Sequence, residues 1–338
     1  MNVFENYRPQ SQHVWQGRID DPEDIDSFRW HQWIELIDLS KEKVKPISKE
    51  ALGFCFLGFC CDKGVEKNLG RPGASKAPLS IRKEMANLPL RFDRNTRLFD
   101  AGNLYCCKNE LEKSQLELTF IIEKIFSLNL FPIILGGGHE IALSHYNGIV
   151  HSIPKFKNKK NAKIGIINFD AHFDLRPYNK EVNSGTMFLQ IADLCKEKNR
   201  NFSYFCLGIQ KYGNTISLFK KAEELNVEYI LAKDIDDSSI PGIMERLANY
   251  IEKHDYIYLT ICADVFSSAY APGVSAPQPF GLHPEIVLKL VKHILGSGKV
   301  IGFDIAEVSP RFDEDNRTAK LAAIIIFALI NTLSESLL

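Results

Sequence analysis

The feature that most constrains this chain is an alternation of two apolar patterns from Ala51 onward. Short segments are apolar at nearly every position, and longer ones, such as 111–129 and 215–226, have apolar residues at helical spacing. Continuous apolar strands interleaved with helices are typical of a parallel sheet covered on both faces. We therefore predict an α/β protein, a three-layer α/β/α sandwich with a mostly parallel, eight-stranded sheet and right-handed crossovers. The expected strands are 52–58, 97–100, 131–135, 163–169, 203–209, 227–231, 255–263 and 299–306.

The first 50 residues differ from the rest of the chain. They contain all three tryptophans, Trp15, Trp30 and Trp33, and an acidic patch at 20–26. We expect residues 1–50 to form an irregular or helical arm that packs on a main domain of residues 51–338. A chain of 338 residues would suit two domains by a general length rule, but single α/β domains also reach this size.

Charge and cysteine usage narrow the class of protein. The 41 basic and 42 acidic side chains disfavour a nucleic-acid or membrane-surface binder, because such proteins need a basic face. The N-terminus has no apolar signal segment, and the apolar stretch 321–333 is short for a bilayer and suits a buried helix. The eight cysteines have no CxxC spacing and are more typical of reduced core thiols than of a disulfide framework. We therefore expect a cytoplasmic protein.

Polar clusters follow four of the predicted strands at the point where each strand ends. The strand 131–135 runs into GGGHE, 163–169 runs into DAHFD, 255–263 runs into Asp264, and 299–306 runs into Glu307. Binding sites of parallel α/β sheets lie beyond the carboxyl ends of the strands. The four clusters are therefore expected to meet in one site that takes a small-molecule substrate.

The residues in these clusters are of the types that bind divalent metals. Asp170, His172 and Asp174 alternate along an extended segment, so their side chains point to one side. Carboxylates combined with imidazoles suit Mn, Zn or Fe. Alone, this triplet is as well explained by a hydrogen-bonded cluster. His139 favours metal binding, because the three glycines before it permit a tight strand-to-helix turn, and Asp264 adds a further carboxylate.

Four motifs together resemble those of the ureohydrolase family, which comprises arginases, agmatinases and formimidoylglutamases. They occur in the family's order, and the resemblance begins near Gly53. The motifs are GGGHE, NFDAHFD, the stretch 262–281 that ends APGVSAPQPFG, and DIAEVSPRFDEDNRTAKLAA.

Several features are most similar to the formimidoylglutamase branch of the family. They are the segment 64–89, Glu140 where other members have serine, LGIQKYGNT at 207–215, and APGVSAP at 271–277. Phe188 stands where arginases place a histidine, which argues against arginase itself.

The resemblance implies an arginase-like fold, a binuclear Mn²⁺ centre with a bridging hydroxide, and a homo-oligomer. The implied reaction is hydrolysis of N-formimidoyl-L-glutamate to L-glutamate and formamide, in histidine degradation. Carried over motif by motif, His139 and Asp174 would bind one metal, His172 and Asp264 the other, and Asp170 both. Glu307 would hold the substrate amidinium over the metals, and Asp174 would carry a proton to the leaving nitrogen.

One position departs from the family pattern. The residue two before Asp264 is usually an aspartate that contacts both metals, and here it is Cys262. A thiolate is a softer ligand than a carboxylate and has to lose a proton before it binds. Three outcomes stay open: a weaker site with Cys262 as a ligand, one dominant ion without it, or a metal-poor pseudoenzyme that serves as a binding subunit.

The remaining candidates concern the far end of the substrate, which carries two carboxylates. Arg176 is placed to bind a carboxylate, although an ion pair with Glu181 is an equal alternative. Arg71 is expected to anchor a loop, or to belong to a lid, rather than to contact substrate. The other substrate-binding candidates are the polar loop Asn183, Ser184, Gly185 and Thr186, together with the weaker candidates Asn214 and Lys211.

Two alternatives concern charge. Glu307 would have a purely structural role if it formed a buried ion pair with Arg311 or Arg317. A different amidinohydrolase, such as an agmatinase or guanidinobutyrase, is the neighbouring functional alternative. Agmatine is cationic at its far end, so its enzyme would need acidic side chains where Arg176 is expected.

Overall fold

One sheet forms the centre of the computed structural model, which describes residues 4–41, 44–48, 51–106, 110–156, 159, 161–178 and 181–335. Its strands are β1 (Tyr7–Arg8), β2 (Glu35–Leu36), β3 (Gly53–Cys60), β4 (Arg97–Tyr105), β5 (Phe131–Leu135), β6 (Ile164–Phe169), β7 (Tyr204–Ile209), β8 (Glu228–Leu231), β9 (Tyr256–Cys262) and β10 (Val300–Ala306). Within the described residues the order is β1-β4-β3-β5-β10-β9-β6-β7-β8, and β2 also pairs with β4. All of these pairings are parallel except that of β1 with β4.

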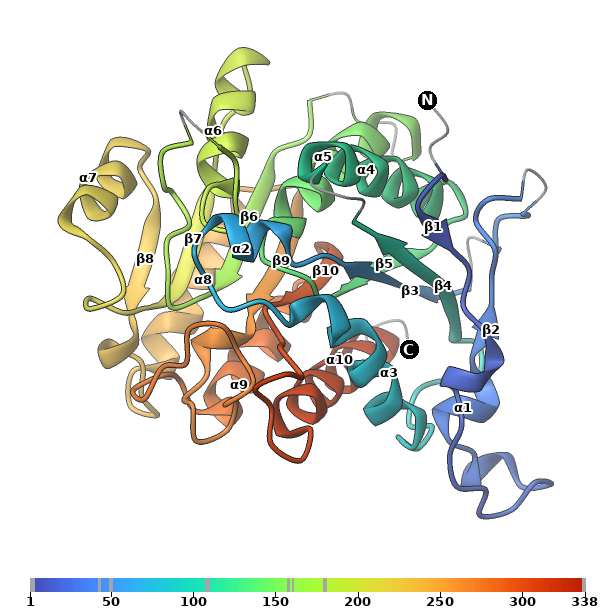
Figure 1. Cartoon of the computed structure of the whole chain (residues 1–338). Coiled ribbons are helices and arrows are strands. Elements are labelled where there is room, and N and C mark those ends of the chain that lie inside the picture. Colours follow the sequence, from blue (N-terminus) through green and yellow to red (C-terminus); the bar gives the residue numbers. More distant parts are fainter. Residues whose placement is uncertain are drawn as a thin grey trace.

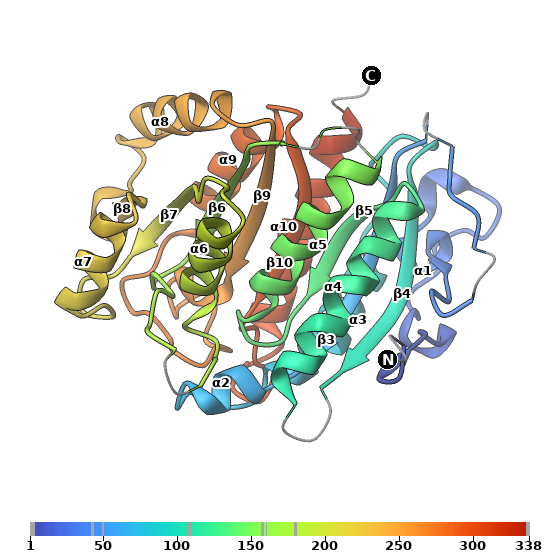
Figure 2. The same cartoon turned by 90° about the horizontal axis from the view of Figure 1, so that it is seen from above.

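Helices cover both faces of the sheet and complete the predicted three layers (Figure 1). They are α1 (Trp30–Trp33), α2 (Lys63–Lys67), α3 (Ala77–Ala86), α4 (Leu111–Ser127), α5 (Ile141–Phe156), α6 (Met187–Glu197), α7 (Ile216–Glu224), α8 (Ile240–Glu252), α9 (Pro284–Leu295) and α10 (Arg317–Glu335). On one face α5 packs between α4 and α6, as seen from above in Figure 2. On the other face α10 packs between α3 and α9, and α8 packs on α9. The α/β/α sandwich is thus confirmed.

Each of the eight predicted strands is present, as β3 to β10, but the predicted number of strands in the sheet was too low. Two strands of the N-terminal arm, β1 and β2, add to the outer edge of β4. Each has two residues, which is too short for a recognisable apolar pattern. β4 also runs beyond the predicted 97–100, because a bulge at Gly102, with φ of +88°, lets the strand continue to Tyr105.

The predicted buried helix around 321–333 is confirmed as α10. By length and composition alone α10 is apolar enough to cross a membrane, with a mean hydropathy of 1.5. However, 61 % of its most apolar window is buried inside the protein, between α3 and α9. That environment is typical of a core helix.

The arm packs on the sheet through two tryptophans. The ring centroids of Trp15 and Trp30 lie 6.2 and 6.1 Å from that of Phe56 on β3. The indole N–H of Trp15 donates to Asp100 on β4, with 2.7 Å between Nε1 and Oδ2. The arm is therefore tied to the core, and the domain boundary after residue 50 stays a prediction.

Asp100 also forms a fully buried ion pair. Arg82 of α3 donates from Nε and Nη2 to the two carboxylate oxygens at 2.7 and 2.8 Å, and both side chains are 0 % exposed. Arg82 donates in addition to the carbonyl oxygen of Gly102, at 2.7 Å, beside the bulge of β4. One carboxylate thus joins α3, β4 and the arm.

We expect Arg82→Leu to lower the free energy of unfolding by about 3–5 kcal/mol, because it leaves the Asp100 carboxylate buried without its partner charge. Arg97→Ala is the matched control on β4. Arg97 pairs with Glu35 at the surface, where the side chains are 42 % and 45 % exposed, and its loss should cost about 1 kcal/mol or less. Denaturant titrations measure both changes. Equal losses would contradict the special role of the buried pair.

Candidate metal centre

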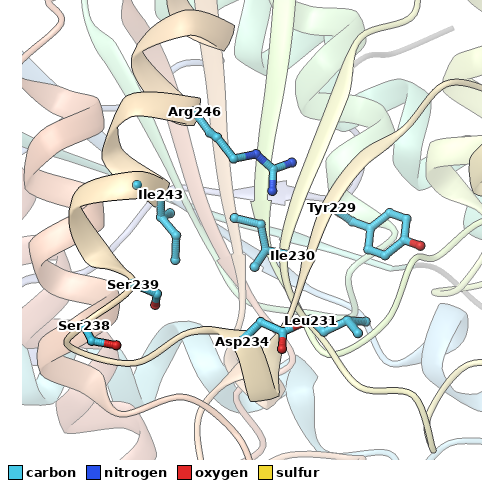
Figure 3. A pocket seen from close by; sticks show the side chains of 9 residues that line it. Tyr229, Ile230, Leu231, Asp234, Ser238, Ser239, Ile243 and Arg246 are labelled. Atoms are coloured by element: carbon cyan, nitrogen blue, oxygen red, sulfur yellow. The ribbon is translucent and has the colours of Figure 1, made fainter.

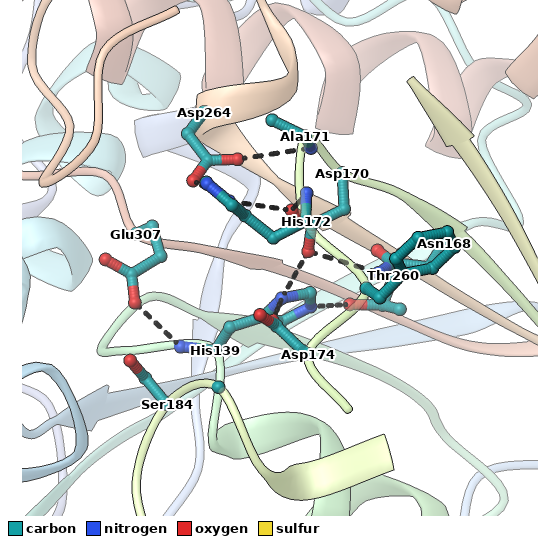
Figure 4. Close-up of polar contacts among 12 residues, drawn as sticks. His139, Asn168, Asp170, Ala171, His172, Asp174, Ser184, Thr260, Asp264 and Glu307 are labelled. Carbon is teal, nitrogen blue, oxygen red and sulfur yellow. Dashed lines mark hydrogen bonds and ion pairs between the residues drawn. The ribbon is translucent and has the colours of Figure 1, made fainter. Parts of the chain in front are cut away.

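The four strand-end clusters lie together at one edge of the sheet. Their strands, β5, β10, β9 and β6, are consecutive neighbours. His139 follows β5, Glu307 follows β10, Cys262 ends β9, and Asp170 follows β6. Figure 4 shows the polar side chains from these strand ends turned toward one another. The site is therefore at the carboxyl edge, where parallel α/β sheets bind ligands.

Unusual backbone conformations bring these side chains close together. Gly136 and Gly137 have φ of +50° and +100°, and a Cβ on Gly137 would lie 2.6 Å from the carbonyl oxygen of Phe59. The carbonyl oxygen of Gly137 accepts a hydrogen bond from the backbone N–H of Glu307, at 2.9 Å. Asp174 and Glu307 have φ of +52° and +64°, which is uncommon for residues with a side chain. Such strain is typical of functional sites.

Two groups of potential ligands share one carboxylate. The first contains His139, Asp170 and Cys262, the second contains Asp170, His172 and Asp264, and within each group the donor atoms lie within 4.8 Å of one another. His139 Nδ1 is 2.9 Å from Asp170 Oδ2, and His172 Nδ1 is 3.1 Å from Asp264 Oδ2. All of these side chains are buried except that of His172, which is 21 % exposed. Because Asp170 belongs to both groups, it is the residue that would contact both ions.

Asp174 lies beside the first group. Its Oδ2 atom is 3.1 Å from Nδ1 of His139. Burial, and then the charge of Asp170, raises the pKa of the Asp174 carboxyl to about 6, although His139 opposes this shift. Without a bound cation, the Asp174 carboxyl therefore resists ionisation more than an ordinary aspartate does.

The site concentrates negative charge in a buried volume. Burial opposes ionisation of Asp170, but hydrogen bonds from His139 and His172 hold its pKa below the usual range. Burial alone would lower the pKa of both histidines, and the adjacent carboxylates raise it well above the usual value. For Cys262 and Glu307, burial and then neighbouring carboxylates raise the pKa. Divalent cations would offset this charge, so the donor set fits a metal centre.

A cavity of about 170 Å³ opens onto the ligand groups. Its other lining residues, besides Glu307 and Asp174, are Asn68, Gly70, Arg176, Ser184, Ser275 and Ala276. Sequence reasoning does not single out Asn68 or Ser275. Asn68 lies in the segment 64–89 and Ser275 in the segment 271–277, both of which resemble the formimidoylglutamase branch, and a polar residue two positions from a glycine is the available signal.

Arg71 holds two loops of the cavity rim together. Its backbone N–H donates to Ser275 Oγ at 2.8 Å. Its guanidinium donates to the carbonyl oxygens of Ser275 and Val274 at 2.9 and 2.7 Å. Arg71 is therefore a loop anchor, as the sequence predicts, and does not line the cavity.

The predicted substrate-binding residues fall into two sets. Arg176 and Ser184 line the cavity. The lining does not include Asn183, Gly185, Thr186, Asn214 or Lys211. The polar groups of Asn183, Gly185 and Thr186 hydrogen-bond to one another, and Asn214 Nδ2 donates to the carbonyl oxygen of Ala171 at 2.9 Å. Asn183, Gly185, Thr186 and Asn214 thus shape the loops that surround the cavity, whereas Lys211 is an exposed side chain outside it.

The ion pairs considered for Arg176 and Glu307 are absent from the described residues. Glu181 pairs with Lys67 at 3.0 Å, not with Arg176. Glu307 has no ion pair in this part of the chain, and its Oε1 atom accepts a hydrogen bond from the backbone N–H of His139 at 3.1 Å. Both charged groups are therefore available to a molecule in the cavity.

Larger cavities elsewhere have a different character. Figure 3 shows one of about 570 Å³ beside β8 and α8. Its charged residues are Asp234 and Arg246, and Arg246 lies over the ring of Phe205. Among the described residues, neither group of metal-binding side chains lies there. The potential metal ligands therefore lie in the smaller cavity of about 170 Å³ and not in this larger one.

Known proteins are similar to this chain over almost its whole length. A model of the arginase family matches residues 52–331. The chain is 52 % identical to a formimidoylglutamase of Clostridium tetani over 331 residues, which cover 98 % of this chain and 97 % of the relative. It is 42 % identical to a formimidoylglutamase of Geobacillus thermodenitrificans, with 94 % of each chain covered.

Solved structures share the fold. The crystal structure of formimidoylglutamase from Bacillus subtilis has a TM-score of 0.76 at 23 % identity, covering 96 % of this chain and 97 % of that one. That of Trypanosoma cruzi formiminoglutamase with Mn²⁺ has a TM-score of 0.73 at 20 % identity, covering 88 % and 97 %. The family-model match and the curated relatives show that the chain belongs to the arginase family.

Proposed function

We propose that this chain hydrolyses N-formimidoyl-L-glutamate to L-glutamate and formamide, as a step of histidine degradation. The observation that carries the proposal is the presence of Glu307 and Arg176 in one cavity beside the ligand groups. An anionic and a cationic side chain suit a substrate that has an amidinium at one end and carboxylates at the other. The relatives from C. tetani and G. thermodenitrificans, which are 52 % and 42 % identical, are both named formimidoylglutamase.

The cavity is proposed to hold two divalent cations. The group with two carboxylates, Asp170, His172 and Asp264, favours Mn²⁺, which is also the ion named for the solved T. cruzi formiminoglutamase. When bound, a pair of such cations supplies hydroxide from water near neutral pH and offsets the charge that develops on the substrate. The proposed ligands are His139, Asp170, Asp174 and Cys262 for one cation, and Asp170, His172 and Asp264 for the other.

Glu307 is proposed to bind the amidinium group. The backbone N–H of His139 holds its Oε1 atom, and Oε2 is left to accept a hydrogen bond from an amidinium N–H. A charge-assisted hydrogen bond in a buried cavity is stronger than one in water. It would keep the nitrogen protonated, so the amidine carbon stays electrophilic, and it would orient that carbon toward the ligand groups.

Asp174 is proposed to move the proton that the reaction needs. The nitrogen that leaves with glutamate has to gain a proton as its bond to the amidine carbon breaks. The Asp174 carboxyl lies beside the ligand groups, with Oδ2 3.1 Å from His139 Nδ1. From this position it would accept a proton from the attacking water and deliver it to the leaving nitrogen.

Arg176 and Ser184 are proposed to bind the carboxylates of the substrate. The planar guanidinium of Arg176 can donate two parallel hydrogen bonds to one carboxylate. Ser184 Oγ accepts a hydrogen bond from Asn68 Nδ2 at 3.2 Å, which leaves its own hydrogen to be donated to the substrate. Asn183, Gly185, Thr186 and Asn214 then act by holding the loops in place.

His139 is oriented by a chain of hydrogen bonds behind the site. Thr260 donates its hydroxyl hydrogen to Asp304, so Thr260 Oγ1 accepts from His139 Nε2, at 2.9 Å. Asp304 is fully buried and also accepts from Tyr258 and bonds to Nδ1 of His145, at 2.6 Å. These hydrogen bonds therefore hold a hydrogen on Nε2 of His139, so Nδ1, which faces Asp170 and Asp174, would be the atom that binds a cation.

Two alternatives remain to be separated from this proposal. A guanidine with a cationic tail would bring a second positive charge to Arg176, which disfavours an agmatinase-like activity. A metal-poor binding subunit is the alternative that Cys262 keeps open. Similarity to the family also supports a cytoplasmic homo-oligomer as part of the proposal.

Purified protein supplied with Mn²⁺ should release glutamate and formamide from N-formimidoyl-L-glutamate, and should release no urea from agmatine or 4-guanidinobutyrate. Glu307→Gln is the matched variant, because it keeps the volume and the ligand groups but removes the charge. Its turnover should fall by about 10²–10³-fold at unchanged metal content. Urea release by the wild type, or no turnover with a full complement of metal, would overturn the proposal.

Arg176→Met should raise KM for N-formimidoyl-L-glutamate by about 10–100-fold with a smaller effect on kcat, because a hydrogen bond to a charged group contributes about 1.5–3 kcal/mol. Lys211→Met removes an exposed cation outside the cavity lining and serves as the control. Steady-state kinetics of both variants provide the measurement. An equal change in KM for the two variants would exclude a specific contact with Arg176.

Thr260→Val should weaken metal binding by about 10–100-fold, because it removes the hydroxyl that orients His139 while it keeps the side-chain volume. Thr260→Ser retains the hydroxyl and should bind metal nearly as the wild type does. Equilibrium titration of metal-free protein measures the affinities. If valine and serine gave the same affinity, the hydrogen-bond chain would have no role in positioning His139.

A further inference from the structure

The two ligand groups differ in one type of donor. Both contain the Asp170 carboxylate, and each contains one histidine. The first group adds the sulfur of Cys262, whereas the second adds the carboxylate of Asp264. The two positions therefore present different chemistry to a cation.

The sulfur of Cys262 is directed to the first position by the strand that carries it. Cys262 ends β9 and is 2 % exposed. Alternation along the strand places it on the same face as Thr260, whose Oγ1 atom lies 2.9 Å from the His139 ring. Cys262 forms no hydrogen bond with any side chain in the described part of the chain, so its sulfur is available as a donor.

Donor softness decides which cation such a position prefers. Thiolate and imidazole ligands favour Zn²⁺, Co²⁺ and Fe²⁺, whereas carboxylate oxygens suit Mn²⁺. The affinity of mixed nitrogen, oxygen and sulfur sites also rises from Mn²⁺ toward Zn²⁺. The first position, which has a sulfur donor, thus selects against Mn²⁺ more strongly than the second, which has only carboxylate and imidazole donors.

We propose that His139, Asp170 and Cys262 bind a thiophilic divalent cation of the Zn²⁺, Co²⁺ and Fe²⁺ class, with the Cys262 thiolate as a ligand. Asp170, His172 and Asp264 bind Mn²⁺, so the centre holds two different ions. On binding, the thiol proton passes to water and a sulfur–metal bond forms, without oxidation or reduction. The inference rests on the proposed function and deepens it, because it assigns an ion to each position.

A competing arrangement leaves the sulfur unused. Asp174 Oδ2 is 3.1 Å from His139 Nδ1, so Asp174 can complete an oxygen and nitrogen donor set for the first cation. That arrangement predicts the same ion preference in both positions. It differs from the proposal in an observable that does not depend on turnover, the sulfur–metal bond.

The first experiment is titration of metal-free protein with Co²⁺, followed by near-ultraviolet absorption. The wild type should develop a sulfur-to-cobalt charge-transfer band that saturates at one Co²⁺ per chain, and Cys262→Asp should lack it. Cys206→Ala is the matched control, since Cys206 is also a buried cysteine near the site, with Sγ 3.7 Å from the carbonyl oxygen of His172. This control should retain the band.

The second experiment measures Zn²⁺ and Mn²⁺ affinities of the wild type and Cys262→Asp by competition. Loss of a residue that only orients a metal ligand changes metal affinity by about 10–100-fold. Exchange of the ligand itself should therefore reduce the preference for Zn²⁺ over Mn²⁺ by at least about tenfold. Circular dichroism checks that the variant is folded.

No charge-transfer band in the wild type, or equal Zn²⁺ preference in wild type and Cys262→Asp, would overturn the inference. Hydrolysis of N-formimidoyl-L-glutamate is assayed on the same samples and answers a separate question. Turnover without a sulfur–metal band would leave the proposed function standing and remove the thiolate ligand. A band without turnover would leave the thiolate ligand standing and remove the proposed function.

Discussion

Crowding of carboxylates at the carboxyl edge of four adjacent strands is the constraint on which the other features of the site depend. Asp170, Asp174, Asp264 and Glu307 all line one cavity of about 170 Å³. Like charges in a buried volume repel strongly, so the surrounding structure has to compensate them. His139 and His172 supply part of that compensation, as the low pKa of Asp170 indicates. Bound cations would supply the remainder.

The same constraint accounts for the rigidity around the site. Carboxylates that repel one another stay in place only if the backbone holds them, and here Asp174 and Glu307 adopt left-handed conformations. The hydrogen bond between the carbonyl oxygen of Gly137 and the N–H of Glu307 joins the ends of β5 and β10. Thr260 and Asp304 connect β9 and β10 behind His139. Local strain at the site is thus balanced by bonds between neighbouring strands.

The parts of this structure that were predictable from sequence are those encoded by contiguous residues. The apolar runs predicted β3 to β10, and the strand-end motifs predicted which side chains would meet. Contacts outside these motifs, between segments that are distant in the sequence, were not predictable in this way. The bulge at Gly102, the cavity positions of Asn68 and Ser275, and the chain from His139 to Asp304 all depend on packing across the sheet. The roles of the site residues remain predictions.

In the proposed function, charge complementarity across the cavity separates formimidoylglutamate from the guanidines that resemble it. All of these molecules present a planar cation that a buried carboxylate such as Glu307 can bind, so this end does not discriminate. The opposite end does, because Arg176 has no ion pair among the described residues and a bound carboxylate would satisfy it. A cationic tail would instead bring a second positive charge close to Arg176, which is unfavourable. Rejection of the wrong substrate would therefore follow from repulsion at Arg176 rather than from weaker binding at the proposed metal centre.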